Sequence, residues 1–352
     1  MTSPFLDRLG IDLPILQAPM AGVSSPAMAA AVSEAGGLGA LGLGAAGVAG
    51  AQAMIAEVRA RSNRPFNVNL FVHAPAHRDP AREAGWIEHW RPEFAALGAE
   101  PPSMLDEIYT SFATDDAMFA MLLTERPAVI SFHFGLPDAA RIAALRDTGA
   151  TLLATATSLA EARAAEAAGI HAVVAQGWEA GGHRGTFDPD APDDRLGTLA
   201  LVRILARQTG VPVIAAGGIM DGAGIDAALA LGAAAAQLGT AYIATDESLA
   251  DAGYRAALAG APAYHTTMTH AISGRPARCL ANRFTVADVT PEAIPAYPVA
   301  YDLGKALNAA AKARGEPGFG AQWAGQGAPL ARAMPAAALT RTLADEMRKS
   351  RA

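Results

Sequence analysis

Short apolar segments alternate with helical segments along most of the sequence, and this alternation restricts the possible folds most strongly. The apolar segments are rich in β-branched residues and bounded by glycine or proline, as buried strands are. A segment with helical composition follows each of them, which places successive strands parallel in one sheet. Counting gives eight such units in the sequence, over roughly 250 residues, and this favours a closed barrel over an open sheet. We therefore predict an α/β fold, a (β/α)₈ TIM barrel.

The predicted strands and helices divide the chain into a barrel and a cap. We expect strands at residues 14–20, 38–43, 66–72, 128–134, 152–155, 172–175, 211–215 and 235–238. We expect helices between them at residues 26–36, 51–61, 139–148, 158–168, 198–209 and 223–231. Residues 74–106 are rich in proline, tryptophan and charge, and predict an inserted helical segment. Residues 1–261 then form the barrel, and residues 262–352, with helices at 301–314 and 335–349, form a C-terminal cap over its mouth. The cap has too few apolar residues to bury a core of its own.

Composition excludes several classes of protein. The chain of 352 residues is 51% hydrophobic and 17% charged, with a net charge of −7 and a single cysteine, Cys279. The negative net charge argues against a basic surface that would bind nucleic acid, and a single cysteine excludes a disulfide framework. Neither a signal peptide nor an apolar run long enough to span a membrane is visible. We expect a cytoplasmic monomer or small homo-oligomer that binds neither nucleic acid nor membranes.

Three strand exits carry glycine together with polar side chains. The first runs from Gln176 to Gly185 and holds the pair Gly181–Gly182 followed by His183. The others are Gly217–Gly218, after the seventh strand, and Gln237-Leu238-Gly239-Thr240, at the end of the eighth. One such loop could be a surface turn with an incidental histidine, whereas three in series favour a shared site. The last two loops predict a phosphate cradle, in which backbone amides face the anion; helix-capping glycines are the alternative.

Amide and histidine side chains at other strand ends extend this site. A phosphate in the cradle, with Asn69 and Gln176 nearby, suggests a phosphorylated planar cofactor across the barrel mouth. Asn67 lies on the same side of its strand as Asn69, so either could be a core amide, and Asn69 is preferred because it is nearer the strand end. His133 and His183 end two further strands and predict a shared pocket. A metal site is less favoured, because Glu179 is the only other ligand nearby.

A stripe in the cap could complete the pocket. Tyr297, Tyr301 and Lys305 recur at intervals of four, although Pro298 places Tyr297 before the helix proper. Such a stripe suits a pocket for an anionic substrate. An amphipathic helix with solvated polar groups explains the spacing equally well.

Together these residues resemble the class I nitronate monooxygenases, the 2-nitropropane dioxygenase family. The resemblance rests on the segments PILQAPMAG, NVNLFV, SFHFG, ATATS, AQGWEAGGHRGTF, PVIAAGGIMDG, QLGTAYI, SGRPAR and NRF and on the tyrosine–lysine stripe. It implies bound FMN and oxidation of alkyl nitronates, propionate 3-nitronate above all, by O₂ to a carbonyl product and nitrite through a flavin semiquinone. FMN-dependent NAD(P)H reductases of enoyl-acyl carrier protein or quinone share the glycine motifs and are the alternative function. A flavin- or phosphate-ligand binding protein without turnover is a third, less favoured class.

The resemblance also implies roles for individual residues. FMN would be held by Met20, Asn69, Gln176, Gly181, Gly217, Gly218, Gln237, Leu238, Gly239 and Thr240. The substrate site would be lined by His133, His183, Tyr297, Tyr301 and Lys305. His183 and Lys305 would supply positive potential to the anionic nitronate, and His183 would be the candidate base if neutral nitroalkanes are used.

Overall fold

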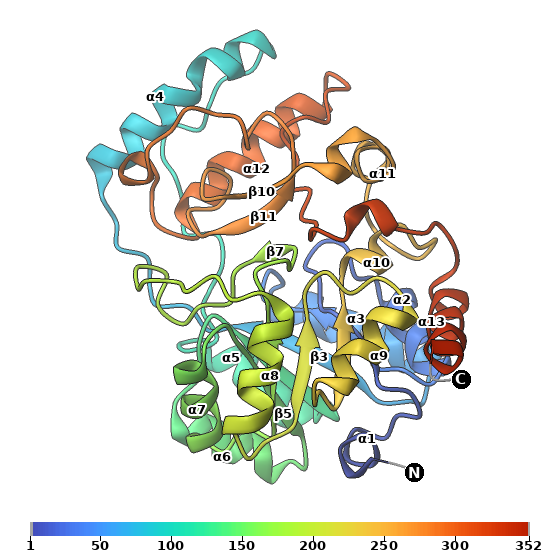
Figure 1. Cartoon of the computed structure of the whole chain (residues 1–352). Helices are drawn as coiled ribbons and strands as arrows, with labels where there is room; N and C mark the ends of the chain where they lie inside the picture. Colours follow the sequence, from blue (N-terminus) through green and yellow to red (C-terminus); the bar gives the residue numbers. More distant parts are fainter. Residues whose placement is uncertain (1–2, 351–352) are drawn as a thin grey trace.

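Eight parallel strands form the centre of the molecule, and helices surround them (Figure 1). The computed structural model describes residues 3–350. The strands are β1 (Ile15–Gln17), β2 (Gly39–Gly42), β3 (Phe66–Phe71), β4 (Val129–His133), β5 (Thr151–Ala156), β6 (Ala172–Gln176), β8 (Val213–Ala216) and β9 (Ala235–Leu238). They are hydrogen-bonded in the order β1-β9-β8-β6-β5-β4-β3-β2, all in parallel. The predicted (β/α)₈ barrel is confirmed.

A single residue closes the barrel between its first two strands. Leu38, which precedes β2, forms a parallel bridge with Leu16 of β1. The Leu38 amide donates to the Ile15 carbonyl at 3.0 Å, and the Gln17 amide donates to the Leu38 carbonyl at 2.9 Å. The two ends of the sheet therefore meet, and the carboxyl ends of all eight strands point to one mouth.

Most helices between the strands begin where the sequence places a capping residue. They are α2 (Pro26–Glu34), α3 (Val48–Arg61), α5 (Asp116–Glu125), α6 (Ala139–Asp147), α7 (Leu159–Ala167), α8 (Thr198–Gln208) and α9 (Gly222–Ala230). Ser25, Asp138, Ser158 and Asp221 each accept a hydrogen bond from the amide three residues later. Such a cap satisfies one of the amides that a helix start leaves unpaired. Helix α5 was not among the predicted elements.

The first strand is shorter than predicted. Residues 18–24 leave the sheet because Gln17 and Ser24 hold them in a loop. Gln17 Nε2 donates to Ser24 Oγ at 2.8 Å, and the Met20 amide donates to the same oxygen at 3.0 Å. This loop carries Met20 over the barrel mouth.

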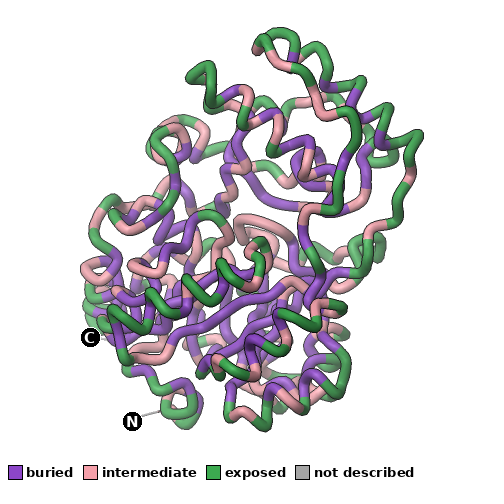
Figure 2. Tube along the Cα trace, turned by 180° about the vertical axis from the view of Figure 1, so that it is seen from behind, coloured by how far each residue is buried: buried purple, intermediate pink, exposed green. Residues whose placement is uncertain are grey.

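The helical insertion and the C-terminal segment pack together above the mouth (Figure 1). The insertion contains α4 (Pro80–Ala96), which contacts α12 (Val299–Lys312). They share a hydrophobic core in which Trp86 and Trp90 of the insertion meet apolar residues of the C-terminal segment. The insertion thus makes up for the small number of apolar residues expected in the cap. Figure 2, seen from behind, shows buried residues in both the barrel and this upper layer.

A small second sheet joins the cap to the barrel. Strand β7 (Gly182–His183) follows β6 and pairs antiparallel with β11 (Ala277–Leu280), which pairs with β10 (Thr266–Thr269). The last helix, α13 (Ala336–Ser350), leaves the cap and packs against α2 and α9 on the barrel wall. The remaining helices are α1 (Pro4–Leu9), α10 (Thr240–Ile243) and α11 (Ala252–Ala259), with short 3₁₀ turns at Ala261–Tyr264, Pro291–Ala293 and Ala328–Leu330. Across residues 3–350, no helix is long and apolar enough to cross a membrane.

Candidate active site

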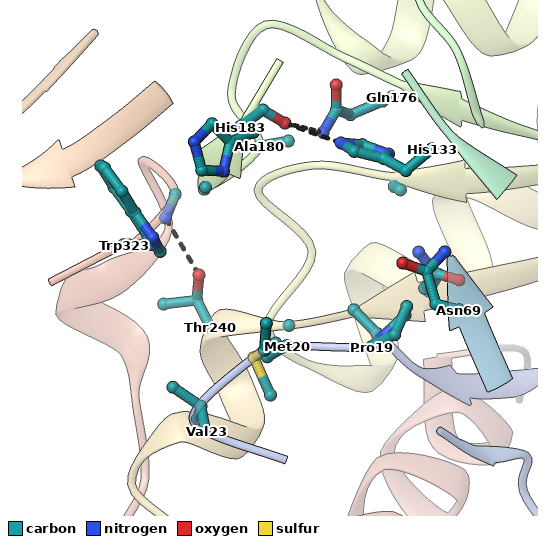
Figure 3. A pocket seen from close by; sticks show the side chains of 18 of the residues that line it. Pro19, Met20, Val23, Asn69, His133, Gln176, Ala180, His183, Thr240 and Trp323 are labelled. Atoms are coloured by element: carbon teal, nitrogen blue, oxygen red, sulfur yellow. Dashed lines mark hydrogen bonds between the residues drawn. The ribbon is translucent and has the colours of Figure 1, made fainter. Parts of the chain in front are cut away.

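A cavity of about 460 Å³ lies at the carboxyl ends of the barrel strands, beneath the cap (Figure 3). Its floor and walls come from strand ends and from the loops that follow them, and its roof comes from the cap residues Tyr301, Lys305 and Trp323. The predicted residues that line it are Met20, Asn69, His133, Gln176, Gly181, His183, Gly217, Gly218, Gln237, Gly239, Thr240, Tyr301 and Lys305. The structure thus brings almost all predicted site residues together.

Two predicted site residues lie outside the cavity wall. Leu238 is only 1% exposed and belongs to the core between the barrel and α13. Because side chains alternate along a strand, it points away from the side that Gln237 presents to the cavity. Tyr297 stands behind His183, with ring centroids 5.4 Å apart, and its buried hydroxyl has no hydrogen-bond partner within residues 3–350. Although it precedes α12, its ring and the ring of Tyr301 both pack against His183 and Tyr109.

Glycine is required at one end of the cavity. Gly217 and Gly218 have φ angles of +130° and +70°, a region that favours glycine. A Cβ on Gly217 would lie 2.6 Å from Thr198 Oγ1, too close for an unshifted structure. Gly181 meets the cap equally closely, since a Cβ there would lie 2.4 Å from the Gly325 amide nitrogen. Bare backbone therefore forms this part of the wall.

The Gln176 side chain organises the loop that carries His183. Its Nε2 donates to the His183 carbonyl at 2.9 Å (Figure 3). Its Oε1 accepts from the Gly185 amide at 2.7 Å. The buried Arg184 adds an ion pair with the half-buried Asp193, with 2.7 Å between Nε and Oδ2. Gln176 thus lines the cavity and also fixes the conformation of residues 176–185.

The two histidines differ in what they contact. His133 takes part in two hydrogen bonds: its Nδ1 lies 2.9 Å from Thr155 Oγ1, and its Nε2 lies 3.2 Å from the His183 carbonyl oxygen. His183 Nε2 lies 2.8 Å from Ser273 Oγ of the cap. No hydrogen-bond partner of His183 Nδ1 is found in the described part of the chain, residues 3–350.

Burial keeps both histidines neutral near pH 7. Loss of solvent, and next the charge of Arg275, lower the pKa of His133 to about 4. Loss of solvent, repulsion from His133 and the charge of Arg275 lower the pKa of His183 to about 3. These values correct the expectation that His183 supplies positive potential, because a neutral imidazole carries no net charge.

Positive charge reaches the cavity from Lys305 and Arg275 instead. Lys305 lies at the open edge, with Nζ 4.9 Å from the Tyr109 ring centroid and 5.8 Å from that of Tyr301. Burial lowers the pKa of Lys305, and Asp302 opposes this effect. Arg275 is only 3% exposed, and its guanidinium lies 4.2 Å from the centroid of the Phe134 ring. Burial lowers the pKa of Arg275 to about 10, which leaves it charged at neutral pH.

Phe134 separates Arg275 from the histidines. It adopts φ = +76°, uncommon for a residue with a side chain, directly after β4. Its ring centroid is 4.5 Å from that of His133 and 5.6 Å from that of His183. The ring therefore fills the space between the buried cation and the cavity wall.

Several site residues escaped the sequence analysis. They are Ser131, Thr155, Tyr109, Trp323 and Ser273. Ser131 had a detectable signal, because it lies in the strand next to Asn69 and in register with it, and Asn69 Nδ2 donates to its hydroxyl at 2.9 Å. Tyr109 and Trp323 lie in irregular segments, where no periodicity marks a side chain as facing the site.

The possible metal ligands of the described residues do not gather into a site. No cluster of three or more His, Cys, Asp or Glu side chains that could hold a metal ion occurs in residues 3–350. Glu179, the one carboxylate considered beside His183, instead accepts from the amide and hydroxyl of Thr198 at the start of α8. Its role there is to cap the helix.

A capped cavity at the carboxyl ends of the strands is where (β/α)₈ barrels carry their active sites, so the fold and the site together define a TIM-barrel enzyme. The model of the nitronate monooxygenase family matches residues 2–346. The chain belongs to this family of flavoenzymes. A nitronate monooxygenase from Paraburkholderia phytofirmans is 60% identical over 347 residues, which are 98% of this chain and 95% of that protein.

Two solved structures are similar over nearly the whole chain. Nitroalkane oxidase from Streptomyces ansochromogenes has a TM-score of 0.92 at 44% identity, and the match covers 99% of both chains. FabK from Thermotoga maritima has a TM-score of 0.76 at 29% identity, over 99% of this chain and 97% of that chain. Both the fold and the sequence are thus nearer to the first protein.

Proposed function

We propose that the protein is an FMN-dependent nitronate monooxygenase, which oxidises alkyl nitronates such as propionate 3-nitronate with O₂ to a carbonyl product and nitrite. Family membership and the high identity to a nitronate monooxygenase support this activity. The observation that carries the proposal is the capped cavity, which joins glycine loops, His183 and Lys305 in one space.

The cavity fits a flavin mononucleotide in size and in chemistry. Its volume of about 460 Å³ falls in the usual range of ligand pockets, roughly 300–1,000 Å³. Gly217–Gly218 and Gly239–Thr240 present backbone without bulky side chains, as a phosphate requires. The amides of Asn69, Gln176 and Gln237 can both donate to and accept from the mixed edge of an isoalloxazine ring. When bound, the flavin supplies the redox chemistry.

The residues of this chain would bind and orient the substrate. A nitronate is already an anion, so its oxidation needs positive potential more than a base. Lys305 offers that potential at the entrance and Arg275 from behind Phe134. The neutral His183 can form a hydrogen bond to the substrate through Nδ1, and the cap residues Tyr301 and Trp323 exclude water from the cavity.

An anaerobic titration of the purified protein tests the proposal. A flavin spectrum that changes with propionate 3-nitronate, but not with NADH or NADPH, supports it, together with O₂ uptake and nitrite release in air. Bleaching by a nicotinamide without any response to the nitronate would assign the protein to the flavin reductases. The weaker similarity to FabK makes that alternative less favoured. Protein that takes up no flavin would exclude both functions.

A further inference from the structure

His133 ends strand β4 within reach of the loop that carries His183, and its ring has two protein partners. We propose that Thr155 and His133 form a positioning pair, which holds His183 in place through its backbone carbonyl. His133 is then a positioning residue and exchanges no proton with the substrate. The activity part of this inference rests on the proposed function.

The partners of His133 determine where its proton lies. The His183 carbonyl can only accept a hydrogen bond, so His133 Nε2, 3.2 Å away, must carry a hydrogen. A neutral imidazole has one N–H, so Nδ1 is then an acceptor. Thr155 Oγ1, 2.9 Å from Nδ1, must donate to it. The chain of donors therefore runs from Thr155 through His133 to the His183 carbonyl.

Both nitrogens of His133 are thereby occupied. Protonation would make Nδ1 a donor as well, and the Thr155 hydroxyl could then no longer donate its hydrogen to Nδ1. Burial lowers the pKa of His133 and so also favours the neutral ring. By contrast, His183 has Nε2 on Ser273, and Nδ1 without a partner among residues 3–350. His183 is therefore the histidine with an atom available to the substrate.

The neighbouring loop is shaped to accept this pair. Gly185 lies directly against it, since a Cβ there would be 2.5 Å from Thr155 Cγ2 and 2.8 Å from His133 Cε1. The His183 carbonyl also accepts from Gln176 Nε2 at 2.9 Å (Figure 3). On the cap side, His183 pairs with Ala277 of β11. His183 thus sits where barrel and cap meet, and His133 contributes one of the two side-chain donors that hold its backbone.

Four variants separate positioning from proton transfer. Thr155→Val removes the donor to Nδ1, and Thr155→Ser restores it. His133→Phe removes the donor to the carbonyl, whereas the amide of His133→Gln can still donate. We expect kcat/KM for propionate 3-nitronate to fall roughly tenfold in Thr155→Val and His133→Phe, as for loss of one buried hydrogen bond, and to recover to within about threefold of wild type in the other two. Thr151→Val, a buried threonine at the start of the same strand, is the matched control and should keep wild-type kinetics.

Nitrogen-15 NMR of histidine-labelled protein supplies a readout that does not depend on turnover. We expect His133 in the wild-type protein to be neutral with its hydrogen on Nε2. The ring signals of His183 should shift in Thr155→Val and return in Thr155→Ser. A His133 that is charged, or that carries its hydrogen on Nδ1, would overturn the inference. Equal loss of activity in His133→Gln and His133→Phe would also overturn it, because it would make His133 a proton-transfer group. If the wild-type protein does not oxidise nitronates, the proposed function fails and NMR alone decides the positioning role.

Discussion

Mild acid should destabilise this protein through its buried neutral histidines. In the folded protein, loss of solvent lowers the pKa of His133 to about 4, whereas an exposed histidine in the unfolded chain has a pKa near 6.5. Between these two values the unfolded chain binds a proton that the folded protein does not. The free energy of unfolding therefore decreases as the pH falls from about 6.5 towards 4.

The size of this effect follows from the two pKa values. At pH 5 the histidine of the unfolded chain is almost fully protonated, while His133 of the folded protein stays mostly neutral. The proton then favours unfolding by about 2 kcal/mol more at pH 5 than at pH 7. The pKa of His183 is lowered further, but His133 itself contributes to that shift, so the two effects are not independent.

Urea denaturation at pH 7 and at pH 5 measures the effect. His73, His171 and His270 also have lowered pKa values and add to the acid sensitivity of the wild-type protein. The comparison with His133→Gln isolates one histidine. We expect the loss of unfolding free energy between the two pH values to be about 2 kcal/mol smaller in this variant. The surface variant His77→Gln controls for the substitution itself, and equal losses in wild type and His133→Gln would refute the reasoning.

Three further predictions concern the cavity. Lys305→Met should raise KM for the nitronate roughly fivefold and weaken the dependence of KM on salt, because the anionic substrate loses its charged partner at the entrance. O₂ uptake at two ionic strengths measures both effects, and an unchanged KM would exclude Lys305 from substrate binding. Arg275→Met should lower kcat/KM for the nitronate about tenfold, because it removes the buried cation behind Phe134. It should also cost about 1–3 kcal/mol of unfolding free energy, because the Thr186 carbonyl loses the hydrogen bond that Arg275 Nη2 donates to it; full activity would show that the charge of Arg275 does not reach the substrate. Gly217→Ala should cost about 1–3 kcal/mol of stability and weaken flavin retention, measured by denaturation and by absorbance of the purified protein. Gly47→Ala is its control, since a Cβ there meets nothing within 4 Å, and a stable, flavin-loaded Gly217→Ala protein would contradict the account of the glycine loop.

The residues at strand ends could be predicted because a barrel brings such ends to one mouth. Asn69, Gln176 and Gln237 are close in space although they are distant in the chain, and the order of strands and helices alone implies this. The same argument placed Gly217 beside Gly239. It could not find Tyr109 and Trp323, which reach the cavity from irregular segments whose path depends on how the insertion and the cap pack together.

The sequence by itself determined the barrel and the set of residues around its mouth. Alternating strands and helices imply a parallel barrel, and in such a barrel the glycines that follow the strands all lie at one mouth. The tertiary structure alone decided what each residue does there. Tyr297 lies outside the cavity wall because it packs behind His183, and Leu238 because it faces the core. His133 and His183 look alike in the sequence, and their hydrogen-bond partners distinguish them. Thr155 and the His183 carbonyl occupy both nitrogens of His133, whereas Ser273 pairs with only one nitrogen of His183 and leaves the other for the substrate. Protonation and hydrogen bonding depend on neighbours from distant parts of the chain, and those neighbours are set by packing.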